Sequence, residues 1–449
     1  MSARVAIVGS GPSGAYAAGH LLRHSAPELH VDLFERLPTP WGLVRAGVAP
    51  DHPKIKSVTR VYERTAAHPR ARYFGNVEFG KHLTRADLLG HYDAVIYAVG
   101  TPTDRPLAIP GEDLNGSHAA VDFVGWYNGH PDHGSWEFDL GVERAVVIGN
   151  GNVALDVARM LTLSHHELSL TDIADHALDA LEHSRIREIL VVGRRGPEQA
   201  AFTNPELLEL GELEDADVVV DPDELAVADR LPDPSASTTA KRNLEVLRGY
   251  AARPLSGRRR KISLHFLQSP VELVGDGRVE AITLERNELA AAPDGALRAR
   301  GTGAESTISA GLVMRAIGYR GSALPDVPFD ERSGLIPNSS GRVTGAPGEY
   351  VVGWIKRGPS GVIGTNKKDA QETVDALLED LAAGRLPVAR EPLDDASLER
   401  LVHERQPNAV TYAEWVEIDE HERGLGEPTG RPRVKLTTIE SMLGARRRD

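Results

Sequence analysis

The sequence predicts an α/β protein made of two similar domains, one of them inserted into the other. Two stretches, VAIVGSGPSG at residues 5–14 and VVIGNGNVA at residues 146–154, each run from an apolar strand pattern into a glycine turn and then into a helical pattern. This order is typical of doubly wound, Rossmann-like domains. A chain of 449 residues is also too long for one ordinary core.

Composition limits the chemistry. The chain is 41% apolar and 26% charged, it contains no cysteine, and its net charge is −14. The missing cysteines exclude disulfides, thiolate nucleophiles, Cys-ligated iron–sulfur clusters and Cys-based zinc sites, so we expect no metal centre and an organic cofactor for any redox work. The acidic balance opposes nonspecific nucleic-acid binding. No apolar run is long enough for a membrane span, the first strand starts too early for a signal peptide, and we expect a cytoplasmic protein.

The first glycine turn fits the pattern G-x-G-x-x-G, in which the turn approaches a pyrophosphate and the following helix presents its amide groups and positive dipole end. The next strand-like run, HVDLFE, ends at Glu35, where a carboxylate can bind the two hydroxyls of an unphosphorylated ribose. This site is expected to bind FAD or NAD. The alternative is a glycine turn that serves only tight packing. The expected contact residues are Gly9, Gly11, Pro12, Ser13, Gly14 and Glu35.

The second glycine turn has the G-x-G-x-x-A form, and the strand-like run after it, EILVVGRRG, ends in Arg194 and Arg195 instead of an acid. Paired guanidiniums bind a 2′-phosphate through charge-assisted hydrogen bonds, whereas a carboxylate would repel it. The second nucleotide is therefore expected to be NADP. Two arginines after a strand can also be a solvated turn. The expected contact residues are Gly149, Asn150, Gly151, Asn152, Val153, Ala154, Arg194 and Arg195.

Two glycine-ended strand patterns, YDAVIYAVGT at 92–101 and AGLVMRAIGY at 310–319, mark the expected crossings between domains. We therefore expect an FAD-binding domain at residues 1–101 and 318–449, and an NADP-binding domain inserted at 102–317. An FAD site and an NADP site in one chain indicate hydride transfer between two bound cofactors.

After the second crossing, the sequence predicts a buried strand over 350–355, a glycine-rich loop, and a helix with Thr365 or Asn366 as its N-cap. Five apolar residues of that helix fall on one face: Ala370, Val374, Leu377, Leu378 and Leu381. If the helix points its amino-terminal end at the flavin, its dipole favours negative charge there. The alternative is an ordinary surface loop before a helix.

Several motifs make the chain similar to the adrenodoxin-reductase-like ferredoxin–NADP reductases, in particular their bacterial members. They are VAIVGSGPSGAYAA, PWGLVRAGVAPDHPKIK, GNGNVALDVAR, VVGRRGPEQAAFTNPEL, GWIKRGPSGVIGTNKKDA and GRPRVKL. The resemblance covers essentially the whole chain. It implies a tightly held FAD, NADPH as hydride donor, and single electrons passed to a ferredoxin, or the reverse direction.

The resemblance also implies roles for particular residues. His52 and Glu206 match the pair that orients the nicotinamide and assists catalysis, and Asn152 matches a residue that holds the NADP phosphates. The alternative interpretation of these residues is structural. His52 precedes a proline in a turn, and Asn204-Pro205-Glu206 is a helix start with Asn as N-cap. Further cofactor contacts are implied for Leu43, Trp354, Gly361, Val362, Ile363 and Thr365.

The segment 241–261 is basic in an acidic chain, with eight Lys or Arg and one Glu. A local positive patch would steer an acidic ferredoxin against the repulsion of the whole protein. In the family, docking residues match Arg242 and Arg248, and the run 258–261 adds charge. The alternative is a solvated helix and loop.

Two other functions compete with this hypothesis. A flavin monooxygenase shares the two cofactors, and a nonenzymatic NADP sensor shares the second turn. The absence of cysteine excludes a pyridine-nucleotide-disulfide reductase that works through a redox-active cysteine pair.

Overall fold

The computed structural model describes residues 2–25, 28–293, 295–361, 363–387 and 394–446. By its contacts the chain forms two compact units. The first unit comprises Met1–Thr103, Asn128–Pro131 and Tyr319–Asp449, and the inserted unit comprises Asp104–Tyr127 and Asp132–Gly318. In the described part of the chain, no helix has the length and apolar character needed to cross a membrane.

The first unit is built on a seven-stranded sheet in the order β16-β17-β18-β4-β1-β2-β3, whose five strands from β18 to β3 are parallel. Its strands are β1 (Ser2–Val8), β2 (Glu28–Phe34), β3 (Ala71–Phe74), β4 (Ala94–Tyr97), β16 (Asn338–Ser339), β17 (Arg342–Val343) and β18 (Glu349–Val351). Its helices are α1 (Pro12–Leu22), α2 (Leu43–Ala46), α3 (Pro53–Lys56), α4 (Thr59–Ala66), α5 (Arg85–His91), α14 (Trp354–Arg357), α15 (Ile363–Ala382), α16 (Asp395–Arg405), α17 (Tyr412–Gly426), the 3₁₀ turn η3 (Glu427–Thr429) and α18 (Ile439–Gly444).

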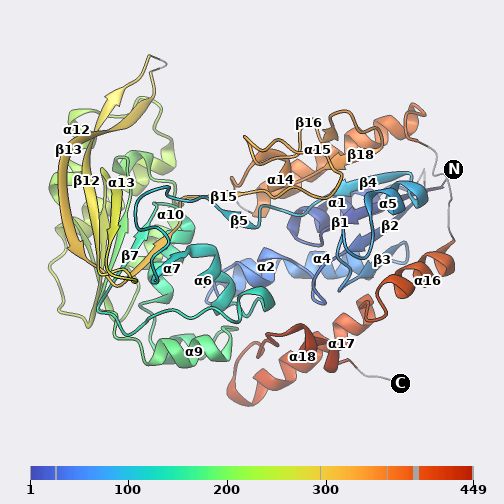
Figure 1. Cartoon of the computed structure of the whole chain (residues 1–449), viewed down its shortest axis with the longest axis horizontal. Coiled ribbons are helices and arrows are strands. Elements are labelled where there is room, and N and C mark those ends of the chain that lie inside the picture. Colours follow the sequence, from blue (N-terminus) through green and yellow to red (C-terminus); the bar gives the residue numbers. More distant parts are fainter. Residues whose placement is uncertain (1, 26–27, 294, 362, 388–393, 447–449) are drawn as a thin grey trace. The chain divides into compact units, whose positions relative to one another are not determined.

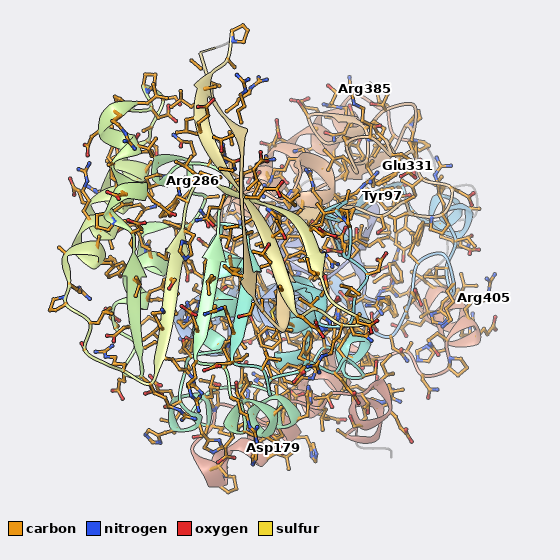
Figure 2. The ribbon with its side chains drawn as sticks, turned by 60° about the vertical axis from the view of Figure 1, so that its left-hand side comes forward. Tyr97, Asp179, Arg286, Glu331, Arg385 and Arg405 are labelled. Carbon is orange, nitrogen blue, oxygen red and sulfur yellow. The ribbon has the colours of Figure 1, made fainter. Side chains whose placement is uncertain are left out.

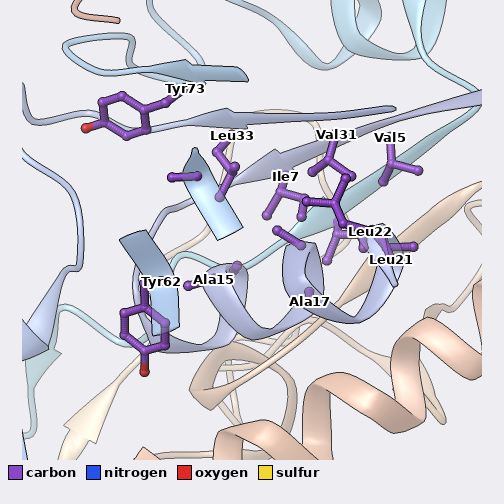
Figure 3. Close-up of a cluster of buried hydrophobic side chains, with 14 of the residues drawn as sticks. Val5, Ile7, Ala15, Ala17, Leu21, Leu22, Val31, Leu33, Tyr62 and Tyr73 are labelled. Carbon is purple, nitrogen blue, oxygen red and sulfur yellow. The ribbon is translucent and has the colours of Figure 1, made fainter. Parts of the chain in front are cut away.

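Both faces of this sheet are buried, because alternate residues of a strand point to opposite sides. On β1, Val5 and Ile7 join one apolar cluster, and Ala6 and Val8 join another. Figure 3 shows the first cluster, in which side chains of α1 pack against those of β1 and β2. This packing fixes the start of α1 at the carboxyl end of β1, where the glycine turn lies.

The inserted unit contains a six-stranded parallel sheet in the order β6-β14-β7-β8-β10-β9 and a three-stranded antiparallel sheet, β11-β12-β13. The parallel strands are β6 (Ser117–Ala119), β7 (Arg144–Ile148), β8 (Glu188–Val192), β9 (Ala216–Val220), β10 (Arg260–His265) and β14 (Leu312–Arg315). The antiparallel strands are β11 (Gln268–Val274), β12 (Ala281–Ala291) and β13 (Leu297–Ser309). The helices are α6 (Ala120–Tyr127), α7 (Asn152–Met160), α8 (His165–Leu168), α9 (Asp175–Glu182), α10 (Asn204–Leu210), α11 (Pro222–Leu225), α12 (Val227–Arg230) and α13 (Thr238–Ala252).

Short elements complete the chain: β5 (Thr103–Asp104), which pairs with β15 (Tyr319–Arg320), and the 3₁₀ turns η1 (Pro131–His133) and η2 (Pro197–Gln199). In the inserted unit, β12 and β13 form the long hairpin seen in Figures 1 and 2. Arg286, which Figure 2 labels on this hairpin, donates to Glu224 Oε1 at 3.0 Å and ties β12 to α11.

The predicted α/β fold with two glycine turns in parallel sheets is confirmed, but two local predictions after the second crossing are wrong. The strand expected over 350–355 ends at Val351, and Trp354 begins a short helix, α14, because Gly353 takes a φ of 80° and turns the chain. Helix α15 begins at Ile363, so Thr365 and Asn366 lie in its first turn and are not N-caps. Its predicted apolar face packs into the core as expected.

Candidate dinucleotide-binding sites

The first glycine turn connects β1 to α1. Gly9 has a φ of 103°, and a Cβ there would lie 2.6 Å from the carbonyl oxygen of Ala98. A Cβ on Gly14 would lie 2.0 Å from the oxygen of Gly9, so the third glycine lets the helix pack on the turn. No side chain caps the start of α1, where Gly11 is the N-cap and Pro12 follows. Pro12 has no amide N–H, so the amides of Ser13 and Gly14 are the ones that the first turn offers to an anion.

Glu35 lies directly after β2 and beside this turn. Its Oε2 accepts the amide N–H of Ser10 at 3.1 Å and the Ser10 hydroxyl at 2.7 Å, and its Oε1 accepts the Leu37 amide at 3.2 Å. The side chain is half-buried. One lone pair of Oε1 remains to accept a hydroxyl group, which fits a ribose beside the pyrophosphate.

A second loop approaches the glycine turn from residues 41–46. A Cβ on Gly42 would lie 3.1 Å from Gly11 Cα, so the two backbones are nearly in contact. The next residue, Leu43, is 43% exposed although it is apolar, and it starts α2. An apolar side chain left exposed beside a turn with free amides fits a site that a planar cofactor would cover.

The 353–365 segment contributes the other side of this site. A Cβ on Gly353 would lie 2.2 Å from Ser13 Oγ, so the turn before α14 packs on the start of α1. Trp354 stacks on Tyr319 with ring centroids 5.5 Å apart. Its indole Nε1 is buried and has no hydrogen-bond partner among the described residues, which leaves a donor for a ligand. Gly361 and Thr365 are exposed and Ile363 is half-buried, while Val362 lies outside the described residues.

The second glycine turn joins β7 to α7. A Cβ on Gly149 would lie 2.3 Å from the carbonyl oxygen of Ala316, so this glycine allows the same close backbone contact as Gly9 makes with Ala98. A Cβ on Gly151 would meet no atom of the described residues within 4 Å. Helix α7 begins at Asn152 with no side-chain cap. Asn152 Oδ1 accepts the Thr203 amide at 2.7 Å, which fixes its side chain against the N-cap residue of α10. Asn150 packs its side chain against Gly193, Val153 is half-buried, and Ala154 is buried.

Arg194 and Arg195 follow β8 and are both exposed. Their backbone is fixed, because Asn287 Nδ2 donates to the Arg194 carbonyl at 2.9 Å and the Leu267 amide donates to the Arg195 carbonyl at 3.1 Å. Within the described residues, neither guanidinium forms an ion pair. Two unpaired guanidiniums on a rigid backbone turn are suited to a phosphate group.

His52 and Glu206 belong to different units. His52 is buried and precedes Pro53 at the start of α3. Glu206 is buried in the first turn of α10, where the buried Arg159 lies 3.5 Å from its carboxylate. Asn204 is not the N-cap, contrary to the sequence-based prediction. Thr203 takes that position, and the Asn204 side chain instead donates to Asn243 at 3.2 Å.

The basic segment is only partly available to a partner. Arg242 is exposed on α13, and Arg248 is exposed but paired with Asp229 at 2.6 Å. The predicted run 258–261 is not a uniform basic surface. Arg260 is 4% exposed and donates to the Thr162 carbonyl, and Lys261 pairs with Glu188 at 2.5 Å. The run fails as a continuous patch because β10 alternates its side chains and turns Arg260 inward.

Sequence reasoning missed Ser10 and Arg159. Ser10 shows no signal beyond its place between the first two glycines. Arg159 could have been found, because it is a charged residue on the apolar face of VALDVARM and therefore needs buried partners. Those partners are Asp156 at 2.8 Å, Glu209 at 3.3 Å and Glu206.

Two parallel sheets, each with a glycine turn at the carboxyl end of a strand and an uncapped helix after it, define a dinucleotide-binding oxidoreductase with two nucleotide sites. The model of the pyridine nucleotide-disulphide oxidoreductase family matches residues 3–191. The NADPH-ferredoxin reductase FprA of Mycobacterium leprae is 53% identical over 98% of this chain and 97% of its own. The human mitochondrial NADPH:adrenodoxin oxidoreductase is 42% identical over 98% of this chain and 91% of its own.

A solved structure of Mycobacterium tuberculosis FprA in complex with NADPH superposes with a TM-score of 0.95 at 51% identity and covers 99% of both chains. The chain therefore belongs to the family of adrenodoxin-reductase-like NADPH–ferredoxin reductases.

Proposed function

We propose that this protein is an FAD-dependent NADPH–ferredoxin oxidoreductase. One observation carries the proposal. Each unit has a glycine turn followed by an uncapped helix, and the next strand is followed by Glu35 in one unit and by Arg194 and Arg195 in the other. A carboxylate accepts hydrogen bonds from ribose hydroxyls, and an arginine pair donates hydrogen bonds to a 2′-phosphate, so the two units bind different nucleotides.

The residues of the first unit fit FAD. Gly11 leaves room for the pyrophosphate, the α1 amides bind it, and Glu35 binds the ribose. Exposed Leu43 and the free Trp354 Nε1 supply an apolar contact and a donor for the ring system. When bound, FAD supplies the chemistry that converts a two-electron hydride donor into a source of single electrons. We assign residues 1–101 and 318–449 to this FAD-binding domain.

The residues of the inserted unit fit NADPH, and we assign residues 102–317 to an NADP-binding domain. The α7 amides and Asn152 bind the pyrophosphate, and the arginine pair binds the 2′-phosphate and discriminates against NADH. His52 and Glu206 are assigned to orienting the nicotinamide. The protein's own contribution is alignment, exclusion of water and electrostatic selection.

We place ferredoxin docking on the exposed face of α13, with Arg242 as its main unpaired cation. Arg248 contributes less, because Asp229 already neutralises it. Positive charge on this face attracts an acidic iron–sulfur protein, although the chain as a whole, with a net charge of −14, repels it. A cytoplasmic location stays a prediction from the sequence.

A steady-state assay tests the function. The purified protein is mixed with NADPH and a purified acidic [2Fe–2S] or [4Fe–4S] ferredoxin under anaerobic conditions, and ferredoxin bleaching is recorded. The proposal expects reduction that depends on both NADPH and the protein. NADPH oxidation that requires oxygen and an organic substrate, with no ferredoxin reduction, would instead identify a monooxygenase. A colourless protein that binds NADPH without oxidising it would identify a nucleotide sensor.

A further inference from the structure

The turn beside the first glycine loop has a strained backbone. Trp41 has a φ of 82° and Gly42 a φ of 47°, and a tryptophan in the left-handed region is rare. Such conformations persist only where the surroundings hold them, and they concentrate at ligand-binding sites. Here the strain brings Gly42 almost into contact with Gly11, the middle glycine of the turn.

The short helix after this turn cannot hold it unaided. α2 spans the four residues Leu43–Ala46 and has no side-chain cap, and a single helical turn is unstable in isolation. Its position must come from tertiary contacts. Trp41 and Val44 pack into the core of the first unit, where the ring of Trp41 lies 5.6 Å from that of Tyr62, and Arg45 is held from the far end of the chain. We call residues 412–436 the C-terminal strap; they comprise α17, η3 and the segment that follows.

Glu422 of the strap makes the central contact. It is 0% exposed, and its two carboxylate oxygens accept Arg45 Nη1 at 2.8 Å and Nη2 at 2.5 Å. Burial raises the pKa of Glu422, but the charge and hydrogen bonds of Arg45, helped by Arg433, outweigh it and lower the pKa overall. The pair is therefore ionised. A buried bidentate pair restricts both side chains to one geometry.

Two further contacts from the strap hold the same residue. The Arg45 guanidinium lies 5.4 Å from the ring centre of Trp415. The Nζ of Lys435, which is 4% exposed, donates to the Arg45 carbonyl at 3.1 Å and to Asn128 Oδ1 at 3.0 Å. Side chain and backbone of Arg45 are thus both fixed from residues that follow it by hundreds of positions in the chain.

We propose that the C-terminal strap is a positioning element of the FAD site, in which Glu422 and Lys435 act through Arg45 to hold the Trp41–Gly42 turn against the glycine loop. This inference rests on the proposed function, since it needs FAD at that loop. Neither strap residue needs to touch FAD. Their effect is to keep Gly42 and Leu43 in the conformation that FAD binds, so that no binding free energy is spent on ordering these two residues.

The test needs a control that breaks a similar pair elsewhere in the same unit. Asp380 is 8% exposed and accepts Arg342 Nε at 2.8 Å and Nη2 at 3.2 Å, together with the Tyr350 hydroxyl. It lies near the end of α15, roughly 25 Å along that helix from its first residue. Asp380→Asn therefore weakens the fold through a buried pair without touching the strap or α2.

Holoproteins of the wild type, Glu422→Gln, Lys435→Met and Asp380→Asn are diluted, and FAD release is followed by the rise of flavin fluorescence. Circular dichroism of the bound flavin and urea unfolding are recorded on the same samples. We expect Glu422→Gln and Lys435→Met to release FAD at least about ten-fold faster than the wild type and to change the flavin dichroism. Asp380→Asn should lower the urea midpoint and release FAD at the wild-type rate.

Wild-type release rates in both strap variants would overturn the inference, and so would an equal acceleration in Asp380→Asn. Lys435→Met keeps the Arg45–Glu422 pair, so it tests the same claim if Glu422→Gln does not fold. A wild-type protein that carries no flavin overturns the proposed function itself, and that result is seen before any variant is made.

Discussion

The carboxylate of Glu35 is bonded to Ser10, accepting its amide N–H at 3.1 Å and its hydroxyl at 2.7 Å. This contact ties the end of β2 to the first glycine turn and fixes the carboxylate at the place where a ribose would bind. The same residue thus stabilises the turn and, under the proposed function, binds the ribose.

Replacing Glu35 with Gln should therefore weaken FAD binding by about ten-fold, because hydrogen bonds to a charged acceptor are stronger than those to an amide. Titration of the flavin-depleted variant with FAD measures the change. The matched control is Asp93→Asn, which alters a carboxylate that accepts the Arg4 amide at 2.8 Å, near the start of β1. An equal loss in both variants would contradict a role for Glu35 at the ribose.

Replacing Arg194 and Arg195 together with Gln should raise the KM for NADPH by about a hundred-fold or more. Each guanidinium loses a charge-assisted hydrogen bond to the 2′-phosphate, and such bonds contribute roughly 1.5–3 kcal/mol. NADH lacks that phosphate, so its KM serves as the control and should change by less than about three-fold. Both values come from the initial rate of flavin-dependent ferricyanide reduction. Equal increases for the two nucleotides would remove the arginine pair from the specificity site.

The free energy of unfolding should fall in acid, because Asp380 becomes protonated. Burial raises its pKa, but hydrogen bonds from Arg342, Tyr350 and Arg385 outweigh burial and lower the pKa from 3.8 to about 2. A carboxyl group whose pKa is lower in the folded state stabilises the protein at pH values above its ordinary pKa of 3.8. This contribution is lost as the pH falls from 3.8 toward 2.

Allowing for solvent screening, Asp380→Asn should cost about 1 kcal/mol at pH 7 and nothing near pH 2. Urea unfolding at both pH values measures the difference. A constant gap between wild type and variant across that range would show that the ionised carboxylate is not the stabilising form.

Arg242→Gln should raise the KM for ferredoxin several-fold at low salt, and the effect should disappear at high salt because exposed charges are screened. Arg248→Gln should have a smaller effect, since Asp229 lies 2.6 Å from it. Arg278→Gln removes an exposed arginine from another loop of the same unit and is the control. If all three variants behave alike, net charge and not α13 attracts the partner.

Local sequence patterns predicted the two glycine turns and the places of Glu35 and the arginine pair after the next strand. Strand, turn and helix follow each other within a few residues there, and each has its own pattern of apolar residues or glycines. They did not predict what depends on distant contacts. Arg45 and Glu422 are 377 positions apart, and no pattern near either residue indicates the other.

The same limit explains the smaller errors. Trp354 lies in an apolar run that looks like a continuing strand, but Gly353 turns the chain where Asp369 Oδ2 accepts its amide at 2.6 Å. In the run 258–261, composition alone indicated a basic patch. Whether each residue is exposed depends on its register in β10, and this places Arg260 inside.

Anaerobic rapid mixing shows directly whether NADPH reduces a bound flavin that then passes its electrons to ferredoxin. The purified protein is mixed with NADPH or with NADH, and flavin absorbance is followed before ferredoxin is added. We expect a yellow protein that NADPH bleaches at least about ten-fold faster than NADH at equal subsaturating concentration, and whose absorbance returns when oxidised ferredoxin is added. A protein that NADPH does not bleach, or one whose reduced form ferredoxin does not reoxidise, would contradict it.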